Sequence, residues 1–214
     1  PLSRRKEIGH LAKKYDVLIV EDDIFGFLYP ESPPCYAALF PEISVYIISL
    51  TKRISPSLRV GIAIAPPHIT MLMAQGITAQ TWMVSPILIS TAIEILNREN
   101  DLISSVQSIT KEAQKRQNLI ENILGPQLKK LNSCRSHAWI ELPDGITGEQ
   151  FVQRAAQTGI HLQAGTRFAN QRGAGSQKVR LSIMAPNQIS SLETALLKLK
   201  TILTTPNEKT YDFF

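Results

Sequence analysis

The sequence predicts an α/β domain followed by a smaller α+β unit, and three observations lead to this fold class. Continuous β-branched runs, "SVYIIS" at 44–49 and "RVGIAIAP" at 59–66, are typical of strands covered on both faces in a mostly parallel sheet. Apolar residues then recur at helical spacing from residue 86 to residue 124. Short strand and helix patterns alternate from there to residue 203. A chain of 214 residues is long enough to bury a substantial core.

The first half of the chain alternates helices and strands. Ser3 can cap a helix that runs to about Tyr15. The segment "DVLIVE" at 16–21 follows as a short buried strand, and a turn-rich stretch separates it from the two β-branched runs. Two prolines then begin a helix at 66–75. These elements make up the larger, α/β part of the prediction.

The second half of the chain is more helical. One apolar-faced helix covers 87–96, and a longer one covers 101–124, where Gly125 and Pro126 end it. The remaining pattern comprises a strand at 137–143, a helix from Thr147 to Thr158, strands at 160–164 and 178–183, and a helix from Pro186 to Leu203. We interpret this last part as the small α+β unit.

The domain boundary is expected inside the long helix. This gives domains at 1–105 and 106–206, with 207–214 as a frayed or partner-docking tail. The opening residues, "PLSRRKEIGH", lack an initiator Met, so we expect the chain to be a fragment of a longer protein.

Composition excludes several classes of protein. Hydrophobic residues make up 43% and charged residues 19%, and no apolar run reaches the roughly 18 residues of a membrane span. No signal peptide is recognisable, so the cytoplasm is the expected compartment. The two cysteines, Cys35 and Cys134, form no CxxC motif, so neither a metal site nor a disulfide framework is expected. The net charge of +5 is scattered, which argues against direct nucleic-acid binding by this segment.

Charged residues gather where the predicted strands end. The sequence "EDD" at 21–23 follows one buried strand, and Lys52 follows the next in "SLTK". Arg59 lies seven residues beyond Lys52, and Arg180 lies in the strand "KVRLSI". In open α/β sheets, ligands bind beyond the carboxyl ends of the strands, where the first two features lie.

A single cofactor, pyridoxal 5'-phosphate, would use these groups together. Lys52 would form the Schiff base, activated by desolvation and by neighbouring cations. Asp22 would hold the pyridine nitrogen protonated, which makes the ring an electron sink. Ser49 and Arg59 would bind the phosphate. Arg180 would bind a substrate carboxylate in a bidentate manner.

Each motif alone also has an ordinary interpretation. A lysine in a loop is usually solvated, and acidic residues after a strand usually belong to a turn or a helix cap. The joint occurrence of these motifs in this chain order indicates a cofactor site more specifically than either motif alone. Thr51 is either a phosphate ligand or a cap of the turn, with the turn favoured. We expect Asp23 to be solvated or helix-capping and Glu21 to point away from the cofactor.

Three segments resemble fold-type I pyridoxal-phosphate aminotransferases of class I/II. They are "LIVEDDIFGFLY" at 18–29, "YIISLTKRISPSLRVGIAIAPP" at 46–67 and "VRLSIMAP" at 179–186, and they match the family pattern D-x-x-Y, S-x-[ST]-K-x₆-R and a late arginine. The resemblance implies the C-terminal part of the large, cofactor-binding domain, a small α+β C-terminal domain and a homodimer. The phosphate turn, a ring-stacking aromatic and an asparagine contact would lie upstream of this chain.

Other segments resemble one branch of that family. "ITAQTWMVSPILISTAIEIL" at 77–96, the pair Arg116-Gln117 and the region "HAWIELP…GIHLQAGTRF" are similar to the aminotransferase-like domain of MocR-type GntR regulators. The resemblance implies a regulator that senses an amino acid or amine through a Lys52 aldimine. DNA would then be bound only by a winged-helix domain outside this chain.

Two alternatives stay open. The chain could belong to a true aminotransferase that exchanges an amino group between an amino acid and a 2-oxo acid, or to a degenerate fold kept for dimerisation without a cofactor. One position departs from the family pattern, because Phe25 stands where D-x-x-Y has a tyrosine. The missing hydroxyl should raise the pKa of the cofactor's imine and weaken turnover, which suits a sensor better than a catalyst. Retention of Lys52, Asp22, Arg59 and Arg180 together argues against the degenerate fold.

Overall fold

The computed structural model describes residues 1–128, 130–134 and 136–205. The chain divides into two compact units, Pro1–Ser108 and Ile109–Phe214, with the division inside helix α6 (Glu99–Leu124). The predicted boundary between residues 105 and 106 falls within the same helix. The predicted tail at 207–214 lies outside the described residues.

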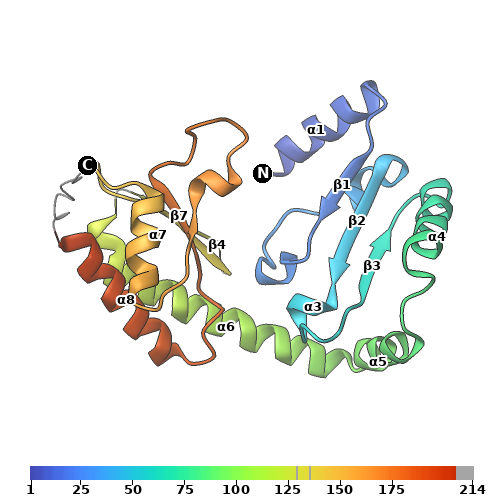
Figure 1. The fold of residues 1–214 in the computed structure, drawn as a ribbon. Helices are drawn as coiled ribbons and strands as arrows, with labels where there is room; N and C mark the ends of the chain where they lie inside the picture. The colour runs from blue at the N-terminus through green and yellow to red at the C-terminus, as the bar shows by residue number, and fades with distance from the viewer. Residues whose placement is uncertain (129, 135, 206–214) are drawn as a thin grey trace. The chain divides into compact units, whose positions relative to one another are not determined.

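The first unit contains a three-stranded sheet in the order β1-β2-β3 (Figure 1). Strand β1 (Ile19–Asp22) runs parallel to β2 (Ser44–Ser49), which pairs with β3 (Gly61–Ile64) in the antiparallel sense. Parallel pairing places the carboxyl ends of β1 and β2 at one edge of the sheet. The antiparallel return of β3 brings its first residue to that edge as well, with Gly61 opposite Ser49.

Five α-helices accompany this sheet in the first unit, besides the start of α6. They are α1 (Leu2–Lys14), α2 (Tyr36–Leu39), α3 (Leu50–Arg53), α4 (Pro67–Thr81) and α5 (Pro86–Asn97). Helices α4 and α5 both begin with proline, whose fixed φ and missing N–H suit the first helical position. The prediction that Ser3 caps α1 is wrong, because Pro1 is the N-cap and no side chain bonds to that helix end.

Burial in the first unit differs from the sequence prediction. Its compact cluster joins Leu50, Leu58 and Val60 to Ala92 of α5. The side chains of Val20 in β1 and Ile64 in β3 are 59% and 58% exposed. The predictions of a buried strand at 16–21 and of a strand covered on both faces at 59–66 are therefore wrong for this chain. A β-branched run reflects strand propensity, whereas burial requires a covering layer that the described residues do not place over these two side chains.

The second unit holds an antiparallel sheet in the order β4-β5-β7-β6. The strands are β4 (Lys130–Cys134), β5 (His137–Glu141), β6 (Gln163–Ala164) and β7 (Lys178–Ser182). Alternate residues of β5 and β7 are buried, so Trp139 and Arg180 share the face opposite the core. In the register of the sheet, Arg180 lies opposite Trp139 on one side and Gln163 on the other.

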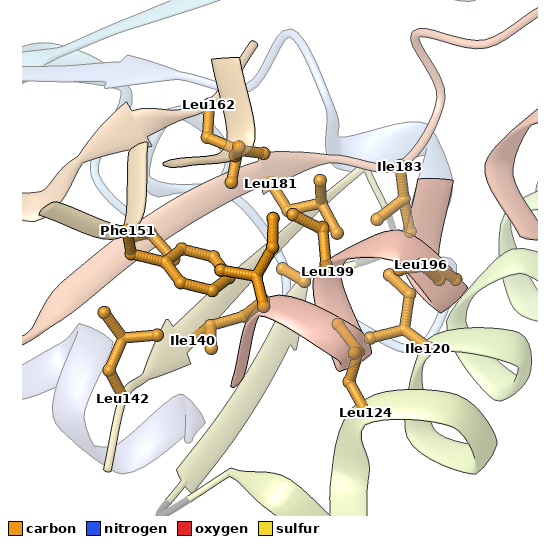
Figure 2. Packing of buried hydrophobic residues seen from close by; sticks show 14 of the residues in the cluster. Ile120, Leu124, Ile140, Leu142, Phe151, Leu162, Leu181, Ile183, Leu196 and Leu199 are labelled. Carbon is orange, nitrogen blue, oxygen red and sulfur yellow. The ribbon is translucent and has the colours of Figure 1, made fainter. Parts of the chain in front are cut away.

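Three helices supply the rest of the second core: α6, α7 (Gly148–Gln157) and α8 (Ile189–Thr204). Thr147 and Thr158, the predicted ends of the seventh helix, are its N-cap and C-cap, and Thr147 forms a capping box with Gln150. Figure 2 shows the apolar side chains that converge there from helices and strands: Ile120, Leu124, Ile140, Leu142, Phe151, Leu162, Leu181, Ile183, Leu196 and Leu199.

Candidate functional site

The exit of β1 places Asp22 beside β2. Asp22 is the last residue of β1 and lies opposite Ile47, and the next backbone N–H, from Asp23, donates to the carbonyl of Ile47 at 2.8 Å. The Asp22 carboxylate is exposed, and its Oδ1 accepts a bond from the backbone of Ile24 at 3.3 Å. The carboxylate is therefore held locally by its own turn and still has acceptor capacity for a ligand.

The end of β2 carries Lys52 on a single helical turn. Ser49 ends β2 and caps α3, because its Oγ accepts a bond from the Thr51 N–H at 3.2 Å. Lys52 follows in that turn, and its Nζ lies 5.9 Å from the ring centroid of Phe25, just beyond β1. The ammonium lies over the aromatic face, which attracts cations. Lys52 and the exit of β1 therefore belong to one site.

The loop after α3 folds back on itself and returns Arg59 to the same place. The Thr51 hydroxyl donates to the carbonyl of Leu58 at 2.9 Å, and the Leu50 N–H donates to the carbonyl of Val60 at 3.2 Å. Arg59 stands between these two anchored positions. The side chains of Leu50, Leu58 and Val60 are buried. Their packing holds in place the loop between β2 and β3 that carries the two cations. Thr51 closes the turn, which is the interpretation that the sequence favoured.

The structure brings together most of the predicted site and corrects one expectation. Asp22, Phe25, Ser49, Lys52 and Arg59 lie in the first unit at the carboxyl ends of β1 and β2, as does Thr51. Lys52 and Arg59 are exposed, so the expected desolvation of Lys52 is not provided by this chain. Within the described residues, neither cation forms an ion pair.

A hydrogen bond that the sequence did not predict stands next to this site. The Tyr46 hydroxyl donates to Oδ2 of Asp23 at 2.6 Å. Burial raises the pKa of Tyr46, and the Asp23 carboxylate raises it further by accepting the phenolic proton. The expectation that Asp23 is solvated or helix-capping is therefore wrong. The pairing of β1 with β2 places Tyr46 within reach, which no single-strand pattern could indicate.

Glu21 serves the scaffold. Its Oε1 accepts a bond from Arg5 of α1 at 2.5 Å, and its Oε2 accepts a bond from the N–H of Tyr36, at the start of α2, at 2.6 Å. Arg5 also donates to the carbonyl of Pro34. One carboxylate thus joins α1, β1 and α2, with both side chains of the ion pair partly buried.

Arg180 lies in the second unit, on the face of β7 opposite the core. Its guanidinium carbon lies over the Phe168 ring at 4.6 Å from the centroid. Behind β7, Arg116 of α6 is only 4% exposed and donates to the carbonyls of Ile183, Pro186 and Asn187. The sequence singled out Arg116 by resemblance alone, and the structure shows that it holds the segment that follows β7.

The comparison with known proteins agrees with this geometry. The sequence matches the family described as "Aminotransferase class I and II" over residues 1–196. The chain belongs to the class I and II aminotransferase family. Among the described residues, this family member has no helix that could span a membrane and no cluster of side chains suited to hold a metal ion.

Relatives of this aminotransferase-family chain include regulators and enzymes. An uncharacterised HTH-type transcriptional regulator of Bacillus subtilis (strain 168), YdeF, is 24% identical over 94% of this chain and 44% of its own length. The 2-aminoadipate transaminase of Thermus thermophilus is 27% identical over 85% of this chain and 48% of its own length. The chain thus spans about half the length of the curated relatives it matches.

A solved structure confirms the fold class. The chain resembles the α-aminoadipate aminotransferase LysN of Thermus thermophilus, complexed with N-(5'-phosphopyridoxyl)-L-leucine, with a TM-score of 0.80 and 23% identity. The match covers 95% of this chain and 54% of LysN. The fold is therefore the C-terminal part of a fold-type I large domain together with the small α+β domain.

Family membership implies pyridoxal 5'-phosphate as the cofactor, and the residues present fit it. The site offers a primary amine from Lys52, a carboxylate from Asp22, a guanidinium from Arg59 and the Ser49 hydroxyl. These types match the aldehyde, the ring nitrogen and the phosphate of that cofactor. The two cations lack ion-pair partners among the described residues, so their charges are available to an anionic ligand.

Proposed function

We propose that residues 1–214 form the pyridoxal-phosphate-binding, aminotransferase-like part of a GntR/MocR-type transcriptional regulator that responds to an amino acid or amine. The observation that carries this proposal is the folded loop from Ser49 to Arg59, which presents Lys52 over the ring of Phe25, three residues beyond Asp22. The regulator YdeF, whose similarity extends over 94% of the chain, supports the regulatory role. Phe25 in place of the family's tyrosine supports sensing over rapid turnover.

Each side chain then has one role. Lys52 would supply the amine that holds the cofactor, and Asp22 would provide the counter-charge for its ring nitrogen. Ser49 and Arg59 bind the phosphate, and Thr51 keeps their loop closed. When bound, the cofactor supplies an aldehyde for amines and a ring that accepts electrons. Arg180 recognises the carboxylate of an amino acid ligand.

A true aminotransferase is the second candidate. It is favoured by the 27% identity to the Thermus thermophilus 2-aminoadipate transaminase and by the complete set of amine, carboxylate and guanidinium groups. In both cases we propose a cytoplasmic homodimer. In the regulator, DNA contact would come from a domain outside residues 1–214.

The cofactor assignment is tested by Lys52→Ala. The protein mixed with pyridoxal phosphate should show a visible absorption band, and the variant should lose it because no primary amine remains at that position. Lys6→Ala, at an exposed position on α1, is the matched control and should keep the band. An unchanged spectrum in Lys52→Ala would refute the assignment.

A second measurement separates the two candidates. A regulator should bind DNA from its own promoter region with an affinity that changes when an amino compound is added, and it should turn over slowly or not at all. An aminotransferase should convert an amino acid and a 2-oxo acid catalytically and should not bind that DNA.

A further inference from the structure

Phe168 and Arg180 form a stacked pair in the second unit. Phe168 ends the short helix η4 (Gly165–Phe168), and the guanidinium carbon of Arg180 lies over its ring, 4.6 Å from the centroid. An aromatic face within about 6 Å attracts a guanidinium through the ring quadrupole. Contact through the face leaves the N–H groups at the edge of the guanidinium, where a carboxylate binds.

Trp139 supports the Phe168 ring from the sheet. The two rings meet edge to face, with centroids 5.4 Å apart and planes at 74°. Trp139 also lies opposite Arg180 in the register of β5 and β7. Aromatic pairs prefer this arrangement, so the ring that carries the arginine is itself held in place.

The neighbours of Arg180 leave its donors available. Gln163 lies opposite it on β6, but the Gln163 Oε1 already accepts a bond from Arg167 at 2.6 Å. Within the described part of the chain, Arg180 forms no ion pair, and its buried Nε has no hydrogen-bond partner. A buried donor without a partner is rare. A ligand carboxylate would bind the terminal N–H groups of the same guanidinium, which form a planar fork.

We propose that Phe168 is a positioning residue that holds the Arg180 guanidinium ready for a ligand carboxylate. This inference rests on the proposed function of Arg180 as the carboxylate-binding residue. A free arginine side chain samples many rotamers and loses that freedom when it binds a ligand. An arginine already held over a ring loses less, so the ligand binds more tightly. Phe168 thereby favours amino acids over amines that lack a carboxylate.

The first test needs neither ligand nor cofactor. Nuclear magnetic resonance relaxation of the Arg180 Nε–H group in the protein, assigned with Arg180→Lys, should show an ordered side chain. Phe168→Leu should make this group mobile, and Phe168→Tyr, which keeps the aromatic face, should leave it ordered. Phe168 is 48% exposed, so these changes should leave the fold intact, which circular dichroism checks. Equal order in Phe168→Leu and the unchanged protein would overturn the proposal.

The second test uses L-leucine and isoamylamine, which share a side chain and differ in the carboxylate. With cofactor bound, Phe168→Leu should weaken L-leucine binding about tenfold, within the range expected for a cation–π contact, and isoamylamine binding about twofold at most. Arg180→Ala should weaken L-leucine binding at least as much. If Arg180→Ala weakens L-leucine but Phe168→Leu does not, the positioning role is refuted. If Arg180→Ala affects both ligands equally, the carboxylate role of Arg180 fails, while the relaxation experiment still decides the role of Phe168.

Discussion

At the residue scale, the Asp23 carboxylate fits closely between Tyr46 and Gly26. A Cβ atom built on Gly26 would overlap Oδ2 of Asp23, the same oxygen that accepts the Tyr46 hydroxyl. Gly26→Ala should therefore displace the carboxylate and break its hydrogen bond. We expect a loss of about 1–3 kcal/mol in the free energy of unfolding, measured by urea denaturation of the protein.

Gly76→Ala is the matched control for this substitution. Gly76 lies inside α4, and nothing comes within 4 Å of an added Cβ there. The same chemical change should be neutral or should stabilise the protein by about 0.5–1 kcal/mol, because alanine is the better helix former. If Gly26→Ala proves as harmless as Gly76→Ala, the Asp23 carboxylate is not confined in the way described.

Tyr46 should also make stability depend on alkaline pH. Burial and the Asp23 carboxylate raise its pKa in the folded protein above the usual value of about 10. The unfolded chain therefore releases the phenolic proton first, and its contribution to stability, fully present below pH 10, falls as the pH rises further. Tyr46→Phe should lower the free energy of unfolding near neutral pH and flatten its decline at higher pH.

Urea denaturation at a series of pH values, carried out on both proteins, checks this expectation. Tyr15→Phe, which removes a hydroxyl from an exposed side chain, is the matched control. A Tyr46→Phe protein whose stability runs parallel to that of the unchanged protein through pH 10 would contradict the assigned hydrogen bond.

At the scale of elements, Arg116 joins α6 to the segment between β7 and α8. Its guanidinium donates at 2.6 Å to the Pro186 carbonyl and at 3.1 Å to the Ile183 carbonyl, and it pairs with Glu112 at 2.7 Å. Arg116→Lys keeps the charge but cannot reach these partners together, so the buried Ile183 carbonyl or the partly buried Pro186 carbonyl loses its donor. We expect a loss of about 2–3 kcal/mol in the free energy of unfolding.

The comparison for this prediction is Arg98, close to the start of the same helix. Arg98 pairs with Glu94, and both side chains are exposed. Arg98→Lys should change stability by less than about 0.5 kcal/mol, because solvent screens exposed pairs. Thermal unfolding of the two variants side by side would contradict the role of Arg116 if their midpoints fell equally.

The sequence predicted elements well where local chemistry sets their limits. The helix predicted from Thr147 to Thr158 has the limits of α7 with its two caps, and Thr51 closes the turn after β2 as the sequence favoured. The predictions from sequence were wrong where a residue's surroundings depend on segments distant in the chain. The pairing of Tyr46 with Asp23 depends on the register of two strands, and the exposure of Val20 depends on what covers the sheet. Neither the hydrogen bond nor the exposure can be predicted from the neighbouring residues in the sequence.

At the scale of the whole chain, the two units differ in the extent of their hydrophobic cores. The second unit has a continuous core of fully buried side chains from three helices and a sheet, including Phe151, Leu124 and Leu196. The cluster of four buried residues in the first unit is smaller, and large apolar side chains such as Ile87 and Trp82 are 78% and 74% exposed. Stability follows buried apolar area, so it should be concentrated in the second unit.

This difference predicts how the two units behave when separated. A fragment of residues 109–205 should fold cooperatively and remain monomeric, because a domain of about 100 residues with a complete core is stable on its own. A fragment of residues 1–108 should unfold without a sharp transition or should associate, because its buried cluster is small and its exposed apolar side chains favour association. Circular dichroism during thermal unfolding measures the cooperativity, and sedimentation velocity measures the association.

Replacing Ile87 and Trp82 by polar residues should reduce the association of the 1–108 fragment. A monomeric, cooperatively folded 1–108 fragment would instead show that its small cluster of buried residues is sufficient for folding.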